Sequence, residues 1–355
     1  MTVAAASPTA TLAGGDKLRR FVTAPARFCL SLAVTLLGLA FVTFLVARVV
    51  PIDPVLVVVG DRAPPEVYAQ ARQQMGLDQP LLMQFVSYLG KLVQGDLGRS
   101  VMTGHSVLAD TLRVFPATLE LAVAGTLIGL LAGVPLGVMA AVRRGRLADQ
   151  VVRIISLVGY SVPVFWLGLV ALLVFYARLD WTPGPGRLDI AYQYTVPEVT
   201  GLVTVDAIIA GEWEAFRNGL AHLVLPAGIL GYLSMAYIAR MTRSLMIEQL
   251  SQEYVLAARA KGVPRRQVIW KHAFGNIRVP LLTVVTLTFT HLLEGAVLSE
   301  TVFAWPGLGL YVTQALFSAD LNAVLGGTLV IGFCFVLINR CADVLYKTLD
   351  PRTRS

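Results

Sequence analysis

The chain has 355 residues, of which 56% are hydrophobic and 14% are charged. Since about a quarter of the residues in an average soluble domain are charged, this composition excludes an ordinary soluble protein and is typical of a membrane protein. A net charge of +7 would also suit a nucleic-acid-binding protein, but the basic residues lie in clusters between apolar runs, and we interpret them as charges that orient membrane helices.

Several apolar runs are long enough to cross a hydrocarbon core of about 30 Å as helices. They are residues 28–50, 117–142, 154–176, 220–238, 281–302 and 323–345. The first run exceeds the apolar core of a signal peptide, which has about 7–15 residues, so we expect a retained helix. Pro135, Pro163 and Pro226 lie inside three runs, where neighbouring helices can satisfy the freed carbonyl groups. The predicted fold is an all-α integral membrane protein with six transmembrane helices.

The lysines and arginines are unevenly divided between the two expected sides of the membrane. About two-thirds of the 29 basic residues lie in four segments: the tail, residues 143–153, residues 240–278 and the segment from Arg340 onward. Such basic clusters stay in the cytoplasm. Both termini are therefore expected to be cytoplasmic. The expected organisation is a tail (1–27), a first membrane helix (28–50), an extracytoplasmic insertion (51–116), a five-helix core (117–346) with an outer loop (178–218) and a cytoplasmic loop (247–278), and a C-terminal tail (347–355).

Two amphipathic helices are predicted in the insertion, at residues 65–75 and 81–93. Leu82, Phe85, Leu89 and Leu92 of the second share one helical face. This pattern suits a helix in the membrane interface, and it equally suits a helix that packs on the bundle.

The polar segment from Leu250 to Pro280 separates two apolar runs and predicts two short helices. Residues 253–261 are rich in helix-forming residues. Gly262 stands where a helix ends in a left-handed residue, and Pro264 stands where the next helix can begin. Residues 265–274 then repeat apolar side chains at helical spacing.

This segment resembles the cytoplasmic loop of ABC importer permeases. Ala257-Ala258, Gly262 and Ile277-x-Val279-Pro280 are similar to the family pattern E-A-A-x-x-x-G followed by I-x-L-P, although Leu256 and Val279 replace its Glu and Leu. The phrases GLDQPL, GDLGRS, ETVFAWPGLG and LYKTLDPRTR extend the resemblance over most of the chain. They resemble the dipeptide/oligopeptide/nickel branch, and within it the B-type subunits of dipeptide permeases.

The resemblance implies a type I ABC importer permease fold and a role in the import of dipeptides or short oligopeptides across the bacterial cytoplasmic (inner) membrane. The implied partners are membrane lipid, a homologous second permease, two cytosolic ATP-binding subunits and an extracytoplasmic substrate-binding protein. The loop at 247–278, called the coupling loop below, would contact an ATP-binding subunit through Ala257, Ala258, Lys261, Gly262, Val263 and Pro264. An ordinary basic hairpin is the alternative for this loop. Nickel, a metal chelate and glutathione are alternative substrates.

No phosphate-binding G-x-x-x-x-G-K-[ST] motif occurs in the sequence, so ATP and Mg²⁺ are expected in partner subunits and no cofactor in this chain. The four histidines lack metal-ligand spacing, and no nucleophile stands at a motif-defined distance from a base. We therefore expect neither a metal site nor enzymatic activity. Cys29, Cys334 and Cys341 are interpreted as buried small hydrophobes. Gly307 and Gly309 are expected to permit a tight turn after the fifth apolar run.

His291 and Glu294 are ionisable residues within an apolar run, and their spacing places them on one helical face. We hypothesise that this face borders the translocation pathway, where Glu294 would meet a peptide amino terminus. An internal salt bridge or a subunit contact is the alternative. Glu120 and Glu300 would be interfacial anchors or docking points for an outer partner. Two alternative functions of a different class stay open. One is a stand-alone secondary transporter with a His291–Glu294 proton relay, and the other is a membrane scaffold.

Overall fold

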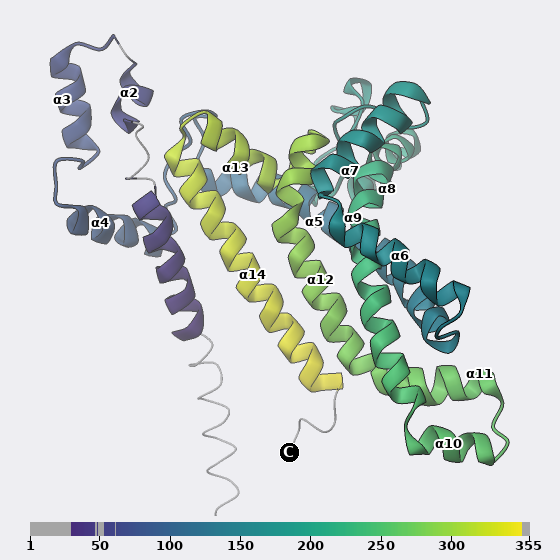
Figure 1. Cartoon of the computed structure of the whole chain (residues 1–355). Coiled ribbons are helices and arrows are strands. Elements are labelled where there is room, and N and C mark those ends of the chain that lie inside the picture. The colour runs from purple at the N-terminus through teal and green to yellow at the C-terminus, as the bar shows by residue number, and fades with distance from the viewer. Residues whose placement is uncertain (1–29, 47, 49–52, 61, 350–355) are drawn as a thin grey trace, which may run out of the picture.

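The protein is described by a computed structural model in which the described residues form helices and connecting turns (Figure 1). The structure describes residues 30–46, 48, 53–60 and 62–349, without the side chains of residues 54, 57, 58, 294 and 342–349. The predicted N-terminal tail, Cys29 and residues 350–355 lie outside this range. The β pairing found within it is an isolated antiparallel bridge between Arg99 and Ser106.

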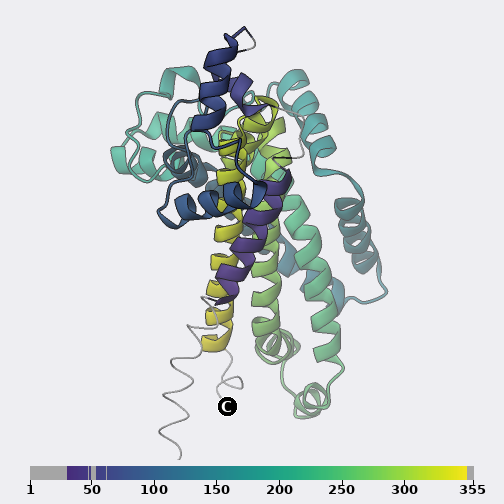
Figure 2. The ribbon, with the colours of Figure 1, turned by 90° about the vertical axis from the view of Figure 1, so that its left-hand side faces the viewer.

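Long helices form the body of the molecule, and shorter ones cover its two ends. Figures 1 and 2 show α9, α12 and α14 side by side between an end that carries α10 and α11 and an end that carries α3 and α8. The helical elements are the first helix (Leu30–Val46), α2 (Pro54–Val59), α3 (Pro65–Gln74), α4 (Leu81–Val93), α5 (Val107–Val142), α6 (Leu147–Ser161), α7 (Val164–Ala171), η1 (Leu172–Arg178), η2 (Ile190–Tyr192), α8 (Val203–Ala210), α9 (Trp213–Leu250), α10 (Glu253–Ala260), α11 (Arg265–Gln267), η3 (Val268–Ala273), α12 (Phe274–Val302), α13 (Leu308–Phe317) and α14 (Leu321–Leu349).

Among the described residues, four helical segments are long and apolar enough to cross a membrane, and a fifth span results if α6 and the helix after it count as one. The four segments are Val107–Val142, Trp213–Leu250, Arg265–Leu293 and Leu321–Cys341. The described part of the first helix is shorter than these. The all-α membrane architecture is therefore confirmed, and the described residues contain four or five candidate spans of the six expected.

The helices extend beyond the apolar runs that predicted them. α5 begins at Val107, inside the predicted insertion, where the Ser106 hydroxyl accepts a hydrogen bond from the Ala109 amide at 3.2 Å. α9 begins at Trp213, inside the predicted outer loop. Hydropathy marks where the hydrocarbon would end, whereas a capped helix continues through polar residues.

The third predicted span is wrong as a single helix. Val162 is extended, with φ −96° and ψ 127°, and α6 meets the following helical segment at 100°. Because the ring of Pro163 disfavours a helical conformation at the preceding residue, the chain breaks there and restarts as α7.

A row of glycines on α5 brings the backbone of α9 into close contact. Gly125, Gly129, Gly133 and Gly137 recur every fourth residue and face α9. A Cβ atom at Gly125 would lie 2.9 Å from Leu230 Cβ, and one at Gly137 would lie 2.6 Å from the Ala239 carbonyl oxygen. Small residues at such spacing are how membrane helices approach closely enough to gain dispersion energy.

Glu300 and Trp305 fix the turn between α12 and α13. The buried Glu300 carboxylate accepts hydrogen bonds from the Thr118 hydroxyl at 2.6 Å and the Leu310 amide at 2.9 Å, and the Trp305 indole donates to the Ala117 carbonyl at 2.8 Å. Glu300 is therefore a packing residue, and the expectation of an interfacial anchor or docking point is wrong because its carboxylate is enclosed.

The glycines of this turn are needed for space and not for an unusual dihedral angle. Gly307 has φ −101°, and a Cβ atom there would lie 2.5 Å from the Glu300 carboxyl carbon. At Gly309 a Cβ atom would lie 2.6 Å from Val297 Cα. The predicted tight turn is present, but its glycines allow the close approach of neighbouring groups.

Glu120 joins the outer loop to α5. It is also buried, and it accepts hydrogen bonds from the Arg187 guanidinium at 2.5 Å and from the Thr204 amide at 3.0 Å. The Arg187 guanidinium also donates to the Gly201 carbonyl at 2.7 Å. The second glutamate expected to be an anchor or docking point is thus also an internal partner, and it orders the loop at 178–218.

Asp206 closes a turn in the same loop. Burial raises the pKa of its carboxyl, but hydrogen bonds from Thr200, Gly201 and Val199 lower the pKa more, and the result is below the ordinary value. The carboxylate therefore stays charged and holds three successive backbone amides.

The second amphipathic helix of the insertion lies across the first helix (Figure 1). Phe85 of α4 packs against Phe41 and Phe44 of the first helix, with ring centroids 5.4 and 5.3 Å apart. Leu82 does not join this contact, because 75% of its surface is exposed. The predicted apolar face is thus divided between packing and an outward surface.

The interpretation of the cysteines as buried holds only in part. Cys334 is half-buried on α14, whereas Cys341 is exposed, so burial does not explain its presence.

Gly129→Leu tests the close α5–α9 contact. The added side chain would overlap Ser234 on α9, and forcing extra atoms into a packed contact costs about 1–3 kcal/mol or more. We expect less folded protein in the membrane and a lower melting temperature after detergent extraction. Gly228→Leu on α9 is the matched control, because nothing lies within 4 Å of a Cβ atom there. Equal stability of the two variants would contradict the role of the glycine row.

Candidate functional site

The coupling loop forms one end of the molecule (Figure 1). The first predicted helix is α10. The second, expected at residues 265–274, consists of α11 and the π-helical segment η3, which leads into α12 without an intervening loop. The predicted pair of helices is confirmed, and the second is continuous with a candidate membrane span that includes residues 265–293.

The tip of the loop is closed by backbone hydrogen bonds. Gly262 has φ +77°, as predicted, and its amide donates to the Arg259 carbonyl at 3.0 Å. The Val263 amide donates to the Ala258 carbonyl at 3.1 Å, which completes a Schellman motif at the end of α10. Pro264 then caps α11, and its carbonyl accepts from the Gln267 amide at 2.8 Å. These bonds satisfy carbonyl groups that a helix end leaves free, so the tip is a defined turn.

Buried side chains hold the loop to the helices above it. Val255 of α10 and Val268 of η3 are fully enclosed. Ala273 belongs to a hydrophobic cluster that includes Met246 of α9 and Ile277 of α12. Burying a valine side chain contributes roughly 1.5–3 kcal/mol, so the loop is itself a packed unit. Ala273 attaches it to α9 and α12 through the shared cluster.

The six residues predicted to contact a partner lie together on α10 and the tip. Ala257, Lys261, Gly262 and Pro264 are exposed, and Ala258 and Val263 are half-buried. Nearby, Leu256 and Trp270 leave 57% and 43% of their surfaces exposed. Sequence reasoning treated Leu256 only as a departure from the family pattern and overlooked Trp270. Exposed aromatic side chains such as Trp270 are enriched at protein interfaces.

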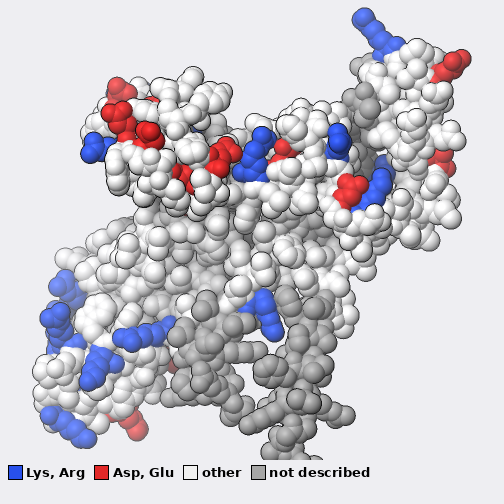
Figure 3. Space-filling model, turned by 180° about the vertical axis from the view of Figure 1, so that it is seen from behind, with Lys and Arg blue, Asp and Glu red and all other residues white. Residues whose placement is uncertain are grey.

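Basic side chains surround these apolar residues. Arg259, Lys261, Arg265, Arg266 and Lys271 are all exposed in the coupling loop. Figure 3 shows lysine and arginine gathered at this end of the molecule, and aspartate and glutamate gathered mainly at the opposite end. The charge division predicted from the sequence is thus present along the length of the fold.

An ion pair joins α6 to α9 close to the coupling loop. The Arg243 guanidinium donates to the Asp149 carboxylate at 2.5 and 2.9 Å, and Asp149 also accepts from the Gly145 amide at 2.9 Å. Asp149 is buried, so the pair is shielded from water. In the sequence Arg243 counted only as one of the basic residues at 240–278, and nothing in the spacing indicated its partner.

His291 and Glu294 lie on successive turns of α12, away from the coupling loop. The imidazole of His291 is exposed, and the side chain of Glu294 is outside what the structure describes. The i, i+3 spacing on this helix places both residues on one helical face. Among the described residues, no cluster of three or more His, Cys, Asp or Glu side chains could hold a metal ion.

Comparison with known proteins identifies the family. Residues 133–355 match the family described as "Binding-protein-dependent transport system inner membrane component", and residues 19–122 match the N-terminal part of such components. The chain is 44% identical over 324 residues to the protein named "Probable D,D-dipeptide transport system permease protein DdpB" of Escherichia coli, covering 91% of this chain and 95% of that protein.

Two further relatives are a di/tripeptide transport system permease protein of Pseudomonas aeruginosa, 42% identical, and a dipeptide transport system permease protein of Escherichia coli, 38% identical. Each alignment covers 90% of this chain and 95% of the relative. A secondary carrier and a membrane scaffold do not fit this relationship. The chain belongs to the family of inner membrane components of binding-protein-dependent transport systems, as a permease subunit and not an ATPase.

Proposed function

We propose that this permease subunit forms half of the translocation pathway of an ABC importer for dipeptides or short oligopeptides. The observation that carries the substrate class is the identity of 38–44% to permeases named for dipeptides or di/tripeptides, over nine-tenths of the chain. A second, homologous permease would form the other half, two cytosolic subunits would hydrolyse ATP with Mg²⁺, and an extracytoplasmic binding protein would deliver the peptide.

The proposed topology has six membrane helices and both termini in the cytoplasm. The first helix would add a span to the five candidates, with α6 and α7 counted as one. The end of α14 lies at the same end of the molecule as the basic coupling loop, which supports a cytoplasmic C-terminus (Figure 1). The segments at 51–116 and 178–218 would then face the binding protein.

The coupling loop would transmit movement of the ATP-binding subunits to the membrane helices. A force applied to α10 reaches α12 through the Schellman turn and the continuous backbone of α11 and η3. The same force reaches α9 through the packing of Ala273 and Met246. Because Arg243 holds Asp149, α6 would follow α9. Rigid-body movement of these helices would switch the pathway between outward and inward access.

The outer loop would receive the binding protein on a surface that is fixed from below. Glu120 and Arg187 attach the loop to α5, while Tyr194 and Trp213 expose 93% and 60% of their surfaces. Exposed aromatic side chains on a rigid support are suited to a protein interface, because little conformational entropy is lost on binding.

Removal of this chain tests the substrate class directly. We expect a strain that lacks only this chain to lose uptake of a labelled dipeptide and to keep uptake of nickel ion. Loss of nickel uptake alone would instead assign the chain to metal import. If neither uptake changed, both of these substrates would be excluded, and competition with glutathione would be measured next.

Glu294→Gln tests the proposed pathway face, which rests on the i, i+3 spacing of His291 and Glu294 on α12. If Glu294 meets the peptide amino terminus, the neutral variant should raise the KM for an unmodified dipeptide and leave the KM for its N-acetylated form unchanged. An unchanged rate and substrate preference in Glu294→Gln would contradict the assignment.

Gly262→Asp tests the coupling role. Nothing in the chain lies within 4 Å of a Cβ atom at Gly262, and Asp tolerates a left-handed backbone better than most residues do. The folded subunit should therefore persist, whereas the exposed tip gains bulk and charge. We expect at least roughly a tenfold fall in peptide uptake, which corresponds to about 1.4 kcal/mol of lost contact, with ATP hydrolysis no longer stimulated by loaded binding protein.

Gly76→Asp is the matched control for this experiment. Gly76 ends α3 at the opposite end of the molecule in a Schellman motif of the same kind, with φ +67°, and nothing lies within 4 Å of a Cβ atom there either. Equal uptake defects in the two variants would show that backbone strain, and not docking, is responsible. The orientation is checked in the same cells, because labelling of Lys261→Cys from outside by an impermeant maleimide would place the loop on the wrong side.

A further inference from the structure

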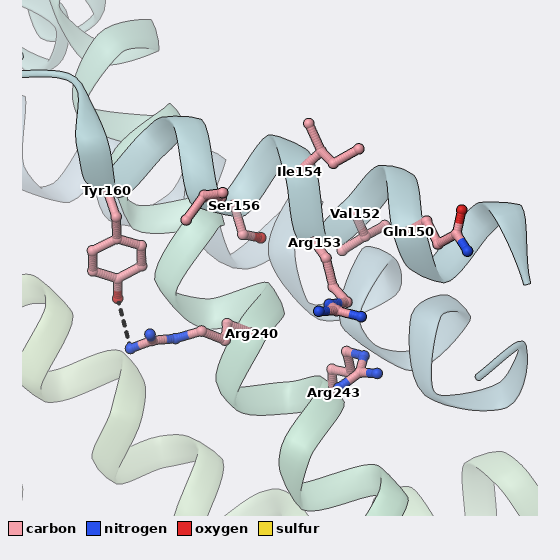
Figure 4. Close-up of a pocket in the computed structure, with 9 residues that line it drawn as sticks. Gln150, Val152, Arg153, Ile154, Ser156, Tyr160, Arg240 and Arg243 are labelled. Atoms are coloured by element: carbon pink, nitrogen blue, oxygen red, sulfur yellow. Dashed lines mark hydrogen bonds between the residues drawn. The ribbon is translucent and has the colours of Figure 1, made fainter. Parts of the chain in front are cut away.

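A pocket of about 630 Å³ lies between α6 and α9 (Figure 4). Its α9 residues, Arg240 and Arg243, stand in the last third of that helix, toward the coupling loop. α6 contributes the apolar side chains of Ile154 and Leu157 and the ring of Tyr160. Arg153 of α6 and Arg240 and Arg243 of α9 add guanidinium groups. The pocket therefore combines an apolar wall with three positive charges: Arg153 and Arg243 lie side by side, and Arg240 reaches toward Tyr160 (Figure 4).

The charges in this pocket are only partly neutralised. Arg243 is paired with Asp149 through two hydrogen bonds. Arg240 lies over the rings of Tyr160 and Tyr237, with its guanidinium carbon 4.5 and 5.9 Å from their centroids, and it donates to the Tyr160 hydroxyl at 3.4 Å. Within the described part of the chain, neither Arg153 nor Arg240 forms an ion pair. The pocket thus keeps an excess of positive charge that an anion would balance.

In the proposed orientation, the α9 side of the pocket begins where the apolar run of that helix ends on the cytoplasmic side. Arg240 follows shortly after the apolar run at residues 220–238, and it precedes the end of α9 at Leu250 by about ten residues, roughly 15 Å of helix. Arginine and tyrosine are common near the membrane surface, where the charged end of a long side chain reaches the polar layer. Ile154 and Leu157 are exposed on α6, where an acyl chain could lie along them.

We propose that this pocket binds the phosphate group of an anionic phospholipid of the cytoplasmic leaflet, with Arg153 and Arg240 as its ligands and Ile154 and Leu157 in contact with an acyl chain. Basic pockets between membrane helices on the cytoplasmic side are suited to such headgroups. The inference rests on the proposed orientation, and it goes beyond the transport role.

A peptide in transit is a poorer fit to the same pocket. A dipeptide carries an ammonium group beside its carboxylate, and the lining residues include no acidic side chain. The nearest carboxylate, that of Asp149, is already occupied by Arg243 and by the Gly145 amide. An ammonium group there would face arginines without a counter-charge, which is unfavourable at reduced dielectric. An anion with an apolar tail carries no ammonium group that would need an acidic partner in this pocket.

The binding experiment uses the purified importer complex, stripped of lipid in detergent and titrated with phosphatidylglycerol or with phosphatidylcholine of the same chains, with bound lipid counted by native mass spectrometry. The wild-type complex should bind phosphatidylglycerol at least about tenfold more tightly than phosphatidylcholine. Arg153→Gln with Arg240→Gln should remove that preference, since each charge-assisted hydrogen bond to a phosphate is stronger than a neutral one. Lysine at both positions should retain most of it.

The matched control is Arg143→Gln with Arg144→Gln, which removes the same charge from the exposed turn between α5 and α6 without touching the pocket. Equal losses in the two double variants would mean general surface attraction and would overturn the site. Equal binding of the two lipids by the wild-type complex would also overturn it, and so would binding of inorganic phosphate as tight as that of the lipid.

Two further measurements separate this inference from other occupants. If the glutamine pair raised the KM for a dipeptide while lipid binding stayed unchanged, the pocket would belong to the peptide pathway. If Leu157→Cys, in a chain without its native cysteines, crosslinked to the second permease in every complex, that subunit would fill the pocket. Lipid binding is measured without peptide or ATP, so its outcome does not depend on whether the proposed substrate is right.

Discussion

The close contact between α5 and α9 is the constraint on which the rest of the fold depends. Four glycines at every fourth position remove the side chains that would otherwise separate the two helices, and Leu230, Ser234 and Ile238 fill the space they leave. In a bilayer the hydrophobic effect gives little force between apolar helices, so such contact must come from close packing. A helix pair held in this way cannot slide by a fraction of a turn without a clash, and α9 therefore moves as a unit with α5.

Because α5 and α9 are rigidly packed, a movement of the coupling loop can displace whole helices. α9 runs from the outer loop to the start of the coupling loop, and α12 begins where η3 ends. Both helices share one hydrophobic cluster at the loop end, and Glu300 and Trp305 secure the opposite end of α12 against α5. A displacement of a few ångströms at α10 would thus be carried along both helices and not absorbed in a flexible hinge. A permease needs this property if ATP hydrolysis is to change access at the far side of the membrane.

The sequence predicted those parts of the coupling loop that a local residue pattern determines. Gly262 was predicted to be left-handed because a helix end favours that conformation, and the two loop helices follow from composition and spacing. The break at Pro163 was missed because hydropathy carries no information on backbone dihedral angles. The early start of α5 was missed because a helix can continue through polar residues beyond its apolar segment. The side-chain partners of Glu120, Glu300 and Arg243 lie between 67 and 182 residues away in the chain. No periodicity reports contacts of that kind, so buried carboxylates were mistaken for surface anchors.

The arginine pocket lies beside the bend that follows α6. α6 and the helical segment after it meet at 100°, so the two do not continue along α9 as one straight helix. α6 packs on α9 along its buried face, with Asp149, Val152, Ser156 and Gly159, and the Tyr160 ring lies against Arg240. The chain then turns by 100° at Pro163. Arg153 and Arg240 are therefore left lining a pocket between the two helices. The ion pair between Asp149 and Arg243 fixes the spacing of these helices. A charged group can therefore approach α9 beside this bend, and the occupant of the arginine pocket would be in contact with α9 during each transport cycle.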